Sequence, residues 1–156
     1  MLKKPSRLSA AGIVLSASVL VSMAMFEGYT DKAVEPVPGD VPTIGFGTTS
    51  GVKMGDKTTP PRALLRLLAD ADKTAQAVRD CAPVPMYQHE FDVYVSLSYN
   101  IGTHAFCSST VARRLNSGDY KGACEAILMW DKFKGKPLPG LTNRRQAEYR
   151  QCLGGA

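Results

Sequence analysis

The chain begins with a long apolar run whose side chains are unusually small. Residues 8–25 contain no charged side chain. As a helix this run would span ~27 Å at about 1.5 Å per residue, close to the ~30 Å hydrocarbon core of a bilayer. Half of its residues are small and partition weakly into lipid, which predicts a marginal membrane helix: Ser9, Ala10, Ala11, Gly12, Ser16, Ala17, Ser18, Ser22 and Ala24.

Beyond this run the pattern predicts a short hairpin followed by helices. Turn-forming residues cluster at 36–40, and residues 41–47 favour a strand. A hairpin of this size is stable only when it packs on helices. Apolar residues then recur at helical spacing, and helices are expected over 59–79, around 91–99, and over 108–116, 119–130 and 143–152. We therefore expect an α+β fold, dominated by helices, with a small N-terminal β-hairpin and a helical body.

Length, composition and charge fit one globular domain with an anionic partner. The chain has 156 residues, of which 44% are hydrophobic and 21% charged, and its net charge is +5. This sign suits nucleic acid, an acidic membrane surface or an acidic cell-wall polymer. The basic residues are dispersed and no nucleic-acid-binding signature accompanies them, so we expect no nucleic-acid partner and a monomer.

The cysteines predict disulfides rather than a metal site. Cys81, Cys107, Cys124 and Cys152 form no C-x-x-C pair, and neither histidine stands at ligand spacing from them. We expect no metal and no cofactor. An even cysteine count behind an export signal indicates two disulfides, with three connectivities open.

Three interpretations of the N-terminal run compete. Lys3, Lys4 and Arg7 precede it, and the positive-inside rule holds such residues in the cytoplasm. Ser22-Met23-Ala24 fits a small-x-small cleavage site, which favours a removed signal peptide. The length favours a permanent anchor. The abundance of small residues favours a segment that inserts, tethers the protein and later leaves the bilayer.

Five motifs follow the run in a fixed order. Glu27-Gly28-Tyr29 comes first, and Pro42-Thr43-Ile44-Gly45-Phe46-Gly47 follows, with Thr43 sixteen residues after Glu27. The later motifs are Ser98-Tyr99-Asn100-Ile101-Gly102, then Ser109-Thr110 with Leu115-Asn116-Ser117-Gly118, and finally Gly140 to Glu148. Together, over residues 26 to about 152, they resemble the phage lysozymes, glycoside hydrolase family 24.

The resemblance implies a lysozyme-like fold and an endolysin, a muramidase that lyses the host cell by acting on peptidoglycan. Its reaction is hydrolysis of the β-1,4 bond between N-acetylmuramic acid and N-acetylglucosamine. Cleavage needs a protonated carboxyl that donates to the leaving oxygen. Glu27 occupies the family's acid position, and its neighbours Met25, Phe26 and Tyr29 favour the protonated form. The resemblance further implies that Thr43 helps to hold the water.

The second carboxylate is where the sequence departs from the family. The family places an Asp, sometimes a Cys, nine residues after the Glu, but here that position is Pro36, and one extra residue separates Glu27 from Thr43. Two carboxylates flank the gap. We favour Asp40, at the tip of the Pro38-Gly39-Asp40 turn, over Glu35, because a turn can present a side chain to a cleft. Each also has a plain interpretation, as a turn aspartate or a solvated charge.

The position of Glu27 decides between the interpretations of the run. Cleavage after Ala24 would leave Glu27 as the third residue of a fraying terminus, whereas a general acid must be held rigidly. We therefore expect residues 1–25 to be a retained signal-arrest-release segment and 26–156 the catalytic domain. The enzyme would sit on the host inner membrane, facing the periplasm, with residues 8–25 in the bilayer, and would then be released to the periplasm. No cysteine lies in the anchor, so release should respond to membrane potential.

Two other functions remain open at this point. A lytic transglycosylase would need only Glu27, whereas Thr43 favours hydrolysis. A non-catalytic, membrane-tethered wall-binding protein is disfavoured by the pairing of Glu27 with Thr43. Trp130 is expected in the core or the cleft wall rather than as a sugar platform, and Arg144 and Arg145 are expected to pair with Glu148 rather than to contact the wall.

Overall fold

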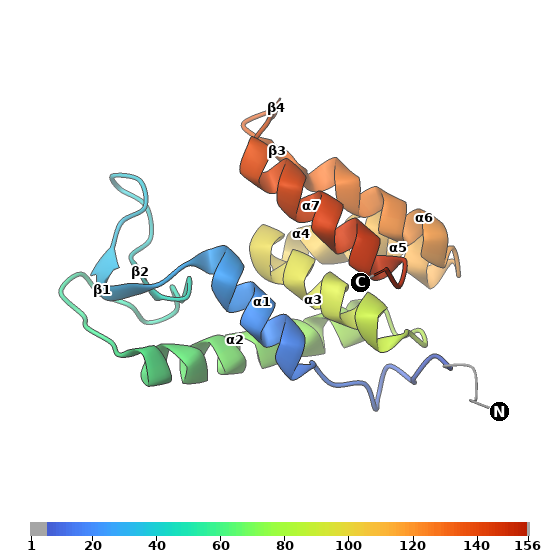
Figure 1. The fold of residues 1–156 in the computed structure, drawn as a ribbon, viewed down its shortest axis with the longest axis horizontal. Helices are drawn as coiled ribbons and strands as arrows, with labels where there is room; N and C mark the ends of the chain where they lie inside the picture. Colours follow the sequence, from blue (N-terminus) through green and yellow to red (C-terminus); the bar gives the residue numbers. More distant parts are fainter. Residues whose placement is uncertain (1–5, 156) are drawn as a thin grey trace. The chain divides into compact units, whose positions relative to one another are not determined.

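A computed structural model describes residues 6–155 and divides them into two compact units. One unit comprises residues 17–73, and the other comprises the described residues before 17 and after 73. The units are described separately below. Figure 1 gives the order of the helices and strands along the chain.

The unit of residues 17–73 joins one helix to a hairpin. Its helix α1 (Ala17–Glu27) is followed by strands β1 (Thr30–Val34) and β2 (Thr43–Gly45), and by the first part of α2 (Pro60–Cys81). The two strands are antiparallel, with an irregular register between their terminal pairs. Gly45, at a positive φ of 65°, lets α2 approach the hairpin, because a Cβ there would lie 2.8 Å from Ala63 Cβ. Hairpin and helix are thereby packed together, as the pattern predicted.

The other unit is a helical body around α3. It contains α3 (Gln88–Ile101), α4 (Thr103–Cys107), α5 (Thr110–Asn116), α6 (Tyr120–Ala126), a 3₁₀ turn (Ile127–Trp130), the strand pair β3 (Lys132–Phe133) and β4 (Lys136–Pro137), and α7 (Pro139–Cys152). Every residue of α3 from Glu90 to Ser98 is buried. Figure 1 shows α7 running beside α3 within this unit. The central helix is therefore the core of the body.

Local signals in the sequence explain where these helices begin. Ser109 caps α5, its hydroxyl accepting the Ala112 amide at 3.2 Å, and Asp119 caps α6 by accepting the Gly122 amide at 2.9 Å. At α3, the Glu90 side chain accepts the Tyr87 amide at 2.8 Å. Each cap satisfies a backbone donor that has no partner within its helix.

The helix-dominated α+β fold is confirmed, with differences in detail. The segment predicted as one helix over 119–130 is split into α6 and the 3₁₀ turn, and the last helix starts at Pro139 rather than at residue 143. The short α4 and the β3–β4 pair were not predicted. Within the apolar run only residues from Ala17 onward are helical. Among residues 6–155, no helix combines the length and apolarity needed to cross a bilayer.

The cysteines form two disulfides, as predicted. The bonds join Cys81 to Cys107 and Cys124 to Cys152, across 26 and 28 residues of sequence. In the chain-entropy model, each loop of this size stabilises the fold by about 3.5 kcal/mol. The structure thereby selects one of the three open connectivities, and both bonds cross-link the helical body. Trp130 packs against the core of the same body, also as predicted.

Candidate active site

Glu27 is the last residue of α1, where a glycine ends the helix. Gly28 adopts a positive φ of 69°, and its amide donates to Ala24 O at 3.2 Å. A left-handed glycine is a common way to stop a helix. The predicted position of Glu27 at the end of an apolar helix is therefore observed, and its side chain is half-buried.

The turn after β2 contacts the Glu27 carboxyl. Ile44 and Thr48 exchange two backbone hydrogen bonds, of 2.9 and 3.1 Å, which close this turn. Gly47 lies inside it at a positive φ of 84°, and a Cβ placed there would be 3.2 Å from Glu27 Oε2. The peptide chain can approach the acid closely only because residue 47 has no side chain. The structure thus brings Glu27 to the segment that begins at Thr43.

Thr43 stands one residue before this turn. Its side chain is half-buried, and its hydroxyl donates to Val41 O at 3.2 Å. A hydroxyl that donates one hydrogen bond keeps lone pairs that can accept another. Thr43 is therefore able to accept a hydrogen bond from a water molecule.

The two candidate second carboxylates both hold the hairpin turn. Asp40 Oδ1 accepts its neighbour's amide, Val41 N, at 2.8 Å, and Glu35 Oε2 accepts Gly39 N at 3.0 Å. Both side chains are exposed. These bonds are the structural roles weighed for each residue, and they do not rank one above the other. The preference for Asp40 stays a prediction.

The apolar neighbours of Glu27 are more exposed than the sequence suggested. Met25 is 80% exposed, Phe26 45% and Tyr29 39%. Tyr29 packs on Phe46 with ring centroids 5.3 Å apart. These three side chains therefore do not enclose the acid, and its half-burial owes more to the close approach of the Gly47 turn.

Sequence reasoning missed one residue that holds this turn. Asp70 on α2 accepts a hydrogen bond from the Thr48 hydroxyl at 3.1 Å, and Thr48 is buried. The pair joins α2 to the turn that contacts Glu27. Its members are 22 residues apart in the chain. No local pattern signals such a pair, since both residue types are common on surfaces.

The last motif forms a buried ion cluster in the helical body. Glu148 forms ion pairs with Arg144 Nε at 3.2 Å and with Arg145 Nε at 2.8 Å. The Ser96 hydroxyl donates a hydrogen bond of 2.9 Å to the same carboxylate. Burial raises the pKa of Glu148, while the two guanidinium groups and the serine hydroxyl oppose that rise. The predicted pairing of both arginines with Glu148 is confirmed, and burial withdraws these side chains from the wall.

Known proteins are similar to this chain in sequence and in fold. A family model described as phage lysozyme matches residues 24–148. A SAR-endolysin of Pseudomonas phage phiKMV is 37% identical over 141 residues, covering 88% of this chain and 87% of its own. The structure of an endolysin from Escherichia coli O157:H7 phage FAHEc1 is 41% identical, with a TM-score of 0.79 and coverage of 91% and 94%.

Two further solved structures resemble this chain in fold. The active form of the P1 phage endolysin Lyz has a TM-score of 0.79 to this chain over 97% of both chains, at 18% identity. The secreted inactive form of the same protein has a TM-score of 0.52, over 67% of this chain and 75% of its own. At this identity the likeness concerns the fold alone.

The chain belongs to the phage lysozyme family. It is a glycoside hydrolase, and within that class a muramidase of the endolysin type, which acts on peptidoglycan. The family membership expected from the five motifs is thus confirmed.

Proposed function

We propose that this muramidase uses Glu27 as its general acid and Thr43 to hold the attacking water. The observation that carries the proposal is the close approach of the Gly47 turn to the Glu27 carboxyl. A half-buried acid fixed between a helix end and a tight turn is held in the way that general acid catalysis requires.

In the proposed reaction, Glu27 donates its proton to the oxygen that links N-acetylmuramic acid to N-acetylglucosamine. The bond between that oxygen and the muramic acid C1 breaks as water adds to C1. Thr43 accepts a hydrogen bond from the water, and a carboxylate on the hairpin removes its proton. A free reducing end on the muramic acid is the result.

The test of the acid is Glu27→Gln, which keeps the shape but cannot donate the proton. Turnover of purified peptidoglycan should fall by on the order of 10²-fold or more, with the thermal midpoint unchanged. A Glu27→Gln enzyme that is folded and turns over at a near-wild-type rate would exclude Glu27 as the acid.

We further propose Asp40, with Glu35 in reserve, as the second carboxylate. Asp40→Asn and Glu35→Gln each keep an acceptor for the turn hydrogen bond, so both should fold. Loss of activity in Asp40→Asn alone supports the proposal, and loss in Glu35→Gln alone reverses the two roles. Full activity in both variants would leave Glu27 as the sole carboxyl and favour the transglycosylase reaction.

We also propose that residues 8–25 anchor the enzyme in the host inner membrane, facing the periplasm, before its release into the periplasm. The exposed surface of α1 supports this. Val21 is 59% exposed and Met25 80%, on a helix that has no charged residue before Glu27. A helix folded only in water would place polar residues there. The similarity to SAR-endolysins supports the same proposal.

The anchor is tested by making the run more apolar. Gly12→Leu with Ser18→Leu should keep the enzyme in the membrane fraction, inactive, after the membrane is depolarised, while wild type is released and active. Ser16 is spared because it contacts Asp92 in the folded enzyme. A membrane-locked variant with full activity, or a wild-type N-terminus at Met25, would contradict the anchor.

A further inference from the structure

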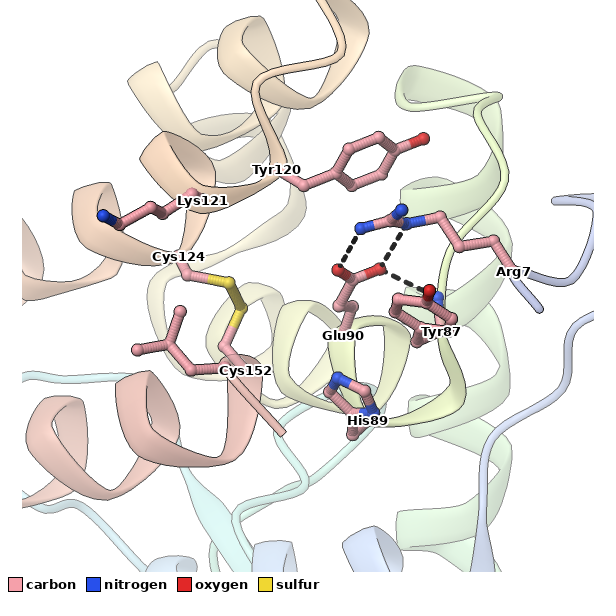
Figure 2. Close-up of a pocket in the computed structure, with 9 residues that line it drawn as sticks. Arg7, Tyr87, His89, Glu90, Tyr120, Lys121, Cys124 and Cys152 are labelled. Atoms are coloured by element: carbon pink, nitrogen blue, oxygen red, sulfur yellow. Dashed lines mark hydrogen bonds and ion pairs between the residues drawn. A yellow bond between two sulfur atoms is a disulfide. The ribbon is translucent and has the colours of Figure 1, made fainter. Parts of the chain in front are cut away.

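Arg7 occupies a pocket built from two tyrosines and one buried carboxylate. Figure 2 shows its guanidinium paired with Glu90, with Nη2 at 2.9 Å from Oε1 and Nε at 3.2 Å from Oε2. The same guanidinium lies 3.6 Å from the ring centroid of Tyr120 and 4.3 Å from that of Tyr87. A planar, bidentate, ring-stacked cation is a geometry that arginine satisfies and lysine does not.

The residue after Arg7 continues the attachment through the backbone. Leu8 donates to Met86 O at 2.8 Å and accepts from Met86 N at 2.9 Å. Farther along, Ile13 is buried in the core of the helical body, and Arg79 donates to its carbonyl at 3.1 Å. Residues 7–16, named here the N-terminal strap, are therefore fixed to the body at several points.

The strap ends at a second buried carboxylate. Asp92 is 3% exposed, and it accepts the Ser16 hydroxyl at 2.6 Å and the Ser16 amide at 3.1 Å. Gln88 supplies it with a third hydrogen bond, of 2.9 Å, and also donates to Val14 O at 2.7 Å. Glu90 and Asp92 lie on the same helix, α3, and each takes a donor from one end of the strap.

Membrane insertion would remove both donors from the body. The strap contains the first half of the run proposed to enter the bilayer. In a membrane helix Arg7 would stand at its cytoplasmic end, and Ser16 about 13 Å farther along, within the lipid. Glu90 and Asp92 would then lose those partners, and a buried carboxylate without its donors is costly.

We propose that Tyr87, Glu90 and Tyr120, together with Asp92, form a receptor for the N-terminal strap, and that binding of Arg7 there secures the released enzyme. The inference rests on the proposed anchor. It adds a specific binding site on the released enzyme for the Arg7 side chain, which starts on the cytoplasmic side of the membrane. Arg7 has to cross outward against a potential that is negative inside, so the potential holds it back until depolarisation.

The charge of Arg7 and its planar geometry therefore have separate roles. Its charge couples retention to the membrane potential, and its planar geometry fits the receptor. The hydrogen bond with Glu90 raises the pKa of the Arg7 guanidinium, which is charged at any physiological pH. Arg7→Lys keeps the charge and weakens the fit, whereas Arg7→Gln removes both. A control is Arg113→Lys, a change at an exposed arginine on another helix.

The fit is measured by hydrogen exchange on the purified, released full-length enzyme. The amides of Leu8 and Met86 report the strap directly, because each donates to the other residue. Exchange at both should rise about tenfold in Arg7→Lys, since a charge-assisted bidentate pair contributes a factor of this order. Exchange in α7 should not change, and Arg113→Lys should match wild type. Unchanged exchange at Leu8 and Met86 in both Arg7 variants would overturn the receptor.

The coupling to potential is measured by fractionation of energised cells. Arg7→Lys should stay in the membrane fraction as wild type does, and a larger share of Arg7→Gln should leave it before depolarisation, although Lys3 and Lys4 keep their charges. Equal retention of all three would overturn the role of the charge. A wild-type enzyme that never enters the membrane fraction would refute the proposed anchor and this role together, whereas the exchange result would still decide whether the receptor binds the strap.

Discussion

Replacing Gly47 by alanine should slow catalysis in addition to weakening the fold. Residue 47 has a φ of 84°, and a Cβ there would lie 3.2 Å from Glu27 Oε2 and 3.6 Å from its Cγ. The contact with Oε2 is tighter than relaxed packing allows, whereas the contact with Cγ is an ordinary van der Waals distance. The carboxyl or the turn must therefore shift by a few tenths of an ångström.

The substitution should affect both the stability of the fold and the catalytic rate. A left-handed conformation costs an alanine roughly 1–2 kcal/mol of stability relative to glycine. A shift of about 1 Å at a catalytic group can cost 10²-fold in rate, so a shift of a few tenths should cost about tenfold. Gly51→Ala separates the two effects, because Gly51 also has a positive φ, of 71°, but a Cβ there meets no atom within 4 Å.

The assay compares kcat on purified peptidoglycan with the free energy of unfolding in urea. Both variants should lose about the same stability, and only Gly47→Ala should lose about tenfold in kcat. If the two variants have equal kcat, the reasoning that this turn positions Glu27 is wrong.

Three further predictions concern the helical body. Glu148→Gln leaves two buried guanidinium groups without their counter-charge, so the free energy of unfolding should fall by about 3–5 kcal/mol in urea titrations; a loss below about 1 kcal/mol would contradict the buried cluster. Replacing Cys124 and Cys152 together by alanine should lower stability by about 2–4 kcal/mol, measured by thermal unfolding. Periplasmic enzyme should contain no thiol that an alkylating reagent can label, and labelling of all four cysteines would disprove both bonds.

Local pattern was enough to predict most of the fold. Apolar spacing located α2 and α3 because each has a continuous buried face, and the predicted starts of α5 and α6 lie at or next to residues that cap them in the structure. The five-residue α4 escaped, since it is too short to show a period and follows directly on Gly102. Apolar residues keep helical spacing in the sequence through the 3₁₀ turn after Ala126, which is why one longer helix was expected there.

The site was predictable only where a motif carries it. Glu27 and Thr43 come from the resemblance of their motifs to those of the phage lysozymes, and the structure brings the segment after Thr43 to the acid. The Thr48–Asp70 bond and the Arg7–Glu90 pair join residues 22 and 83 positions apart. Such pairs are set by packing rather than by local sequence. The disulfide pairing was also open, because loop-closure entropy varies too slowly with loop length to choose among the connectivities.

The central claim is that this enzyme adds water to the muramic acid C1 by acid catalysis. Mass spectrometry of the products released from purified peptidoglycan tests it most directly. Hydrolysis predicts fragments that end in a reducing N-acetylmuramic acid, and these should make up essentially all cleavage products. Fragments that end in the anhydro sugar, lighter by one water molecule, would show that the substrate's own hydroxyl attacks and would contradict the account.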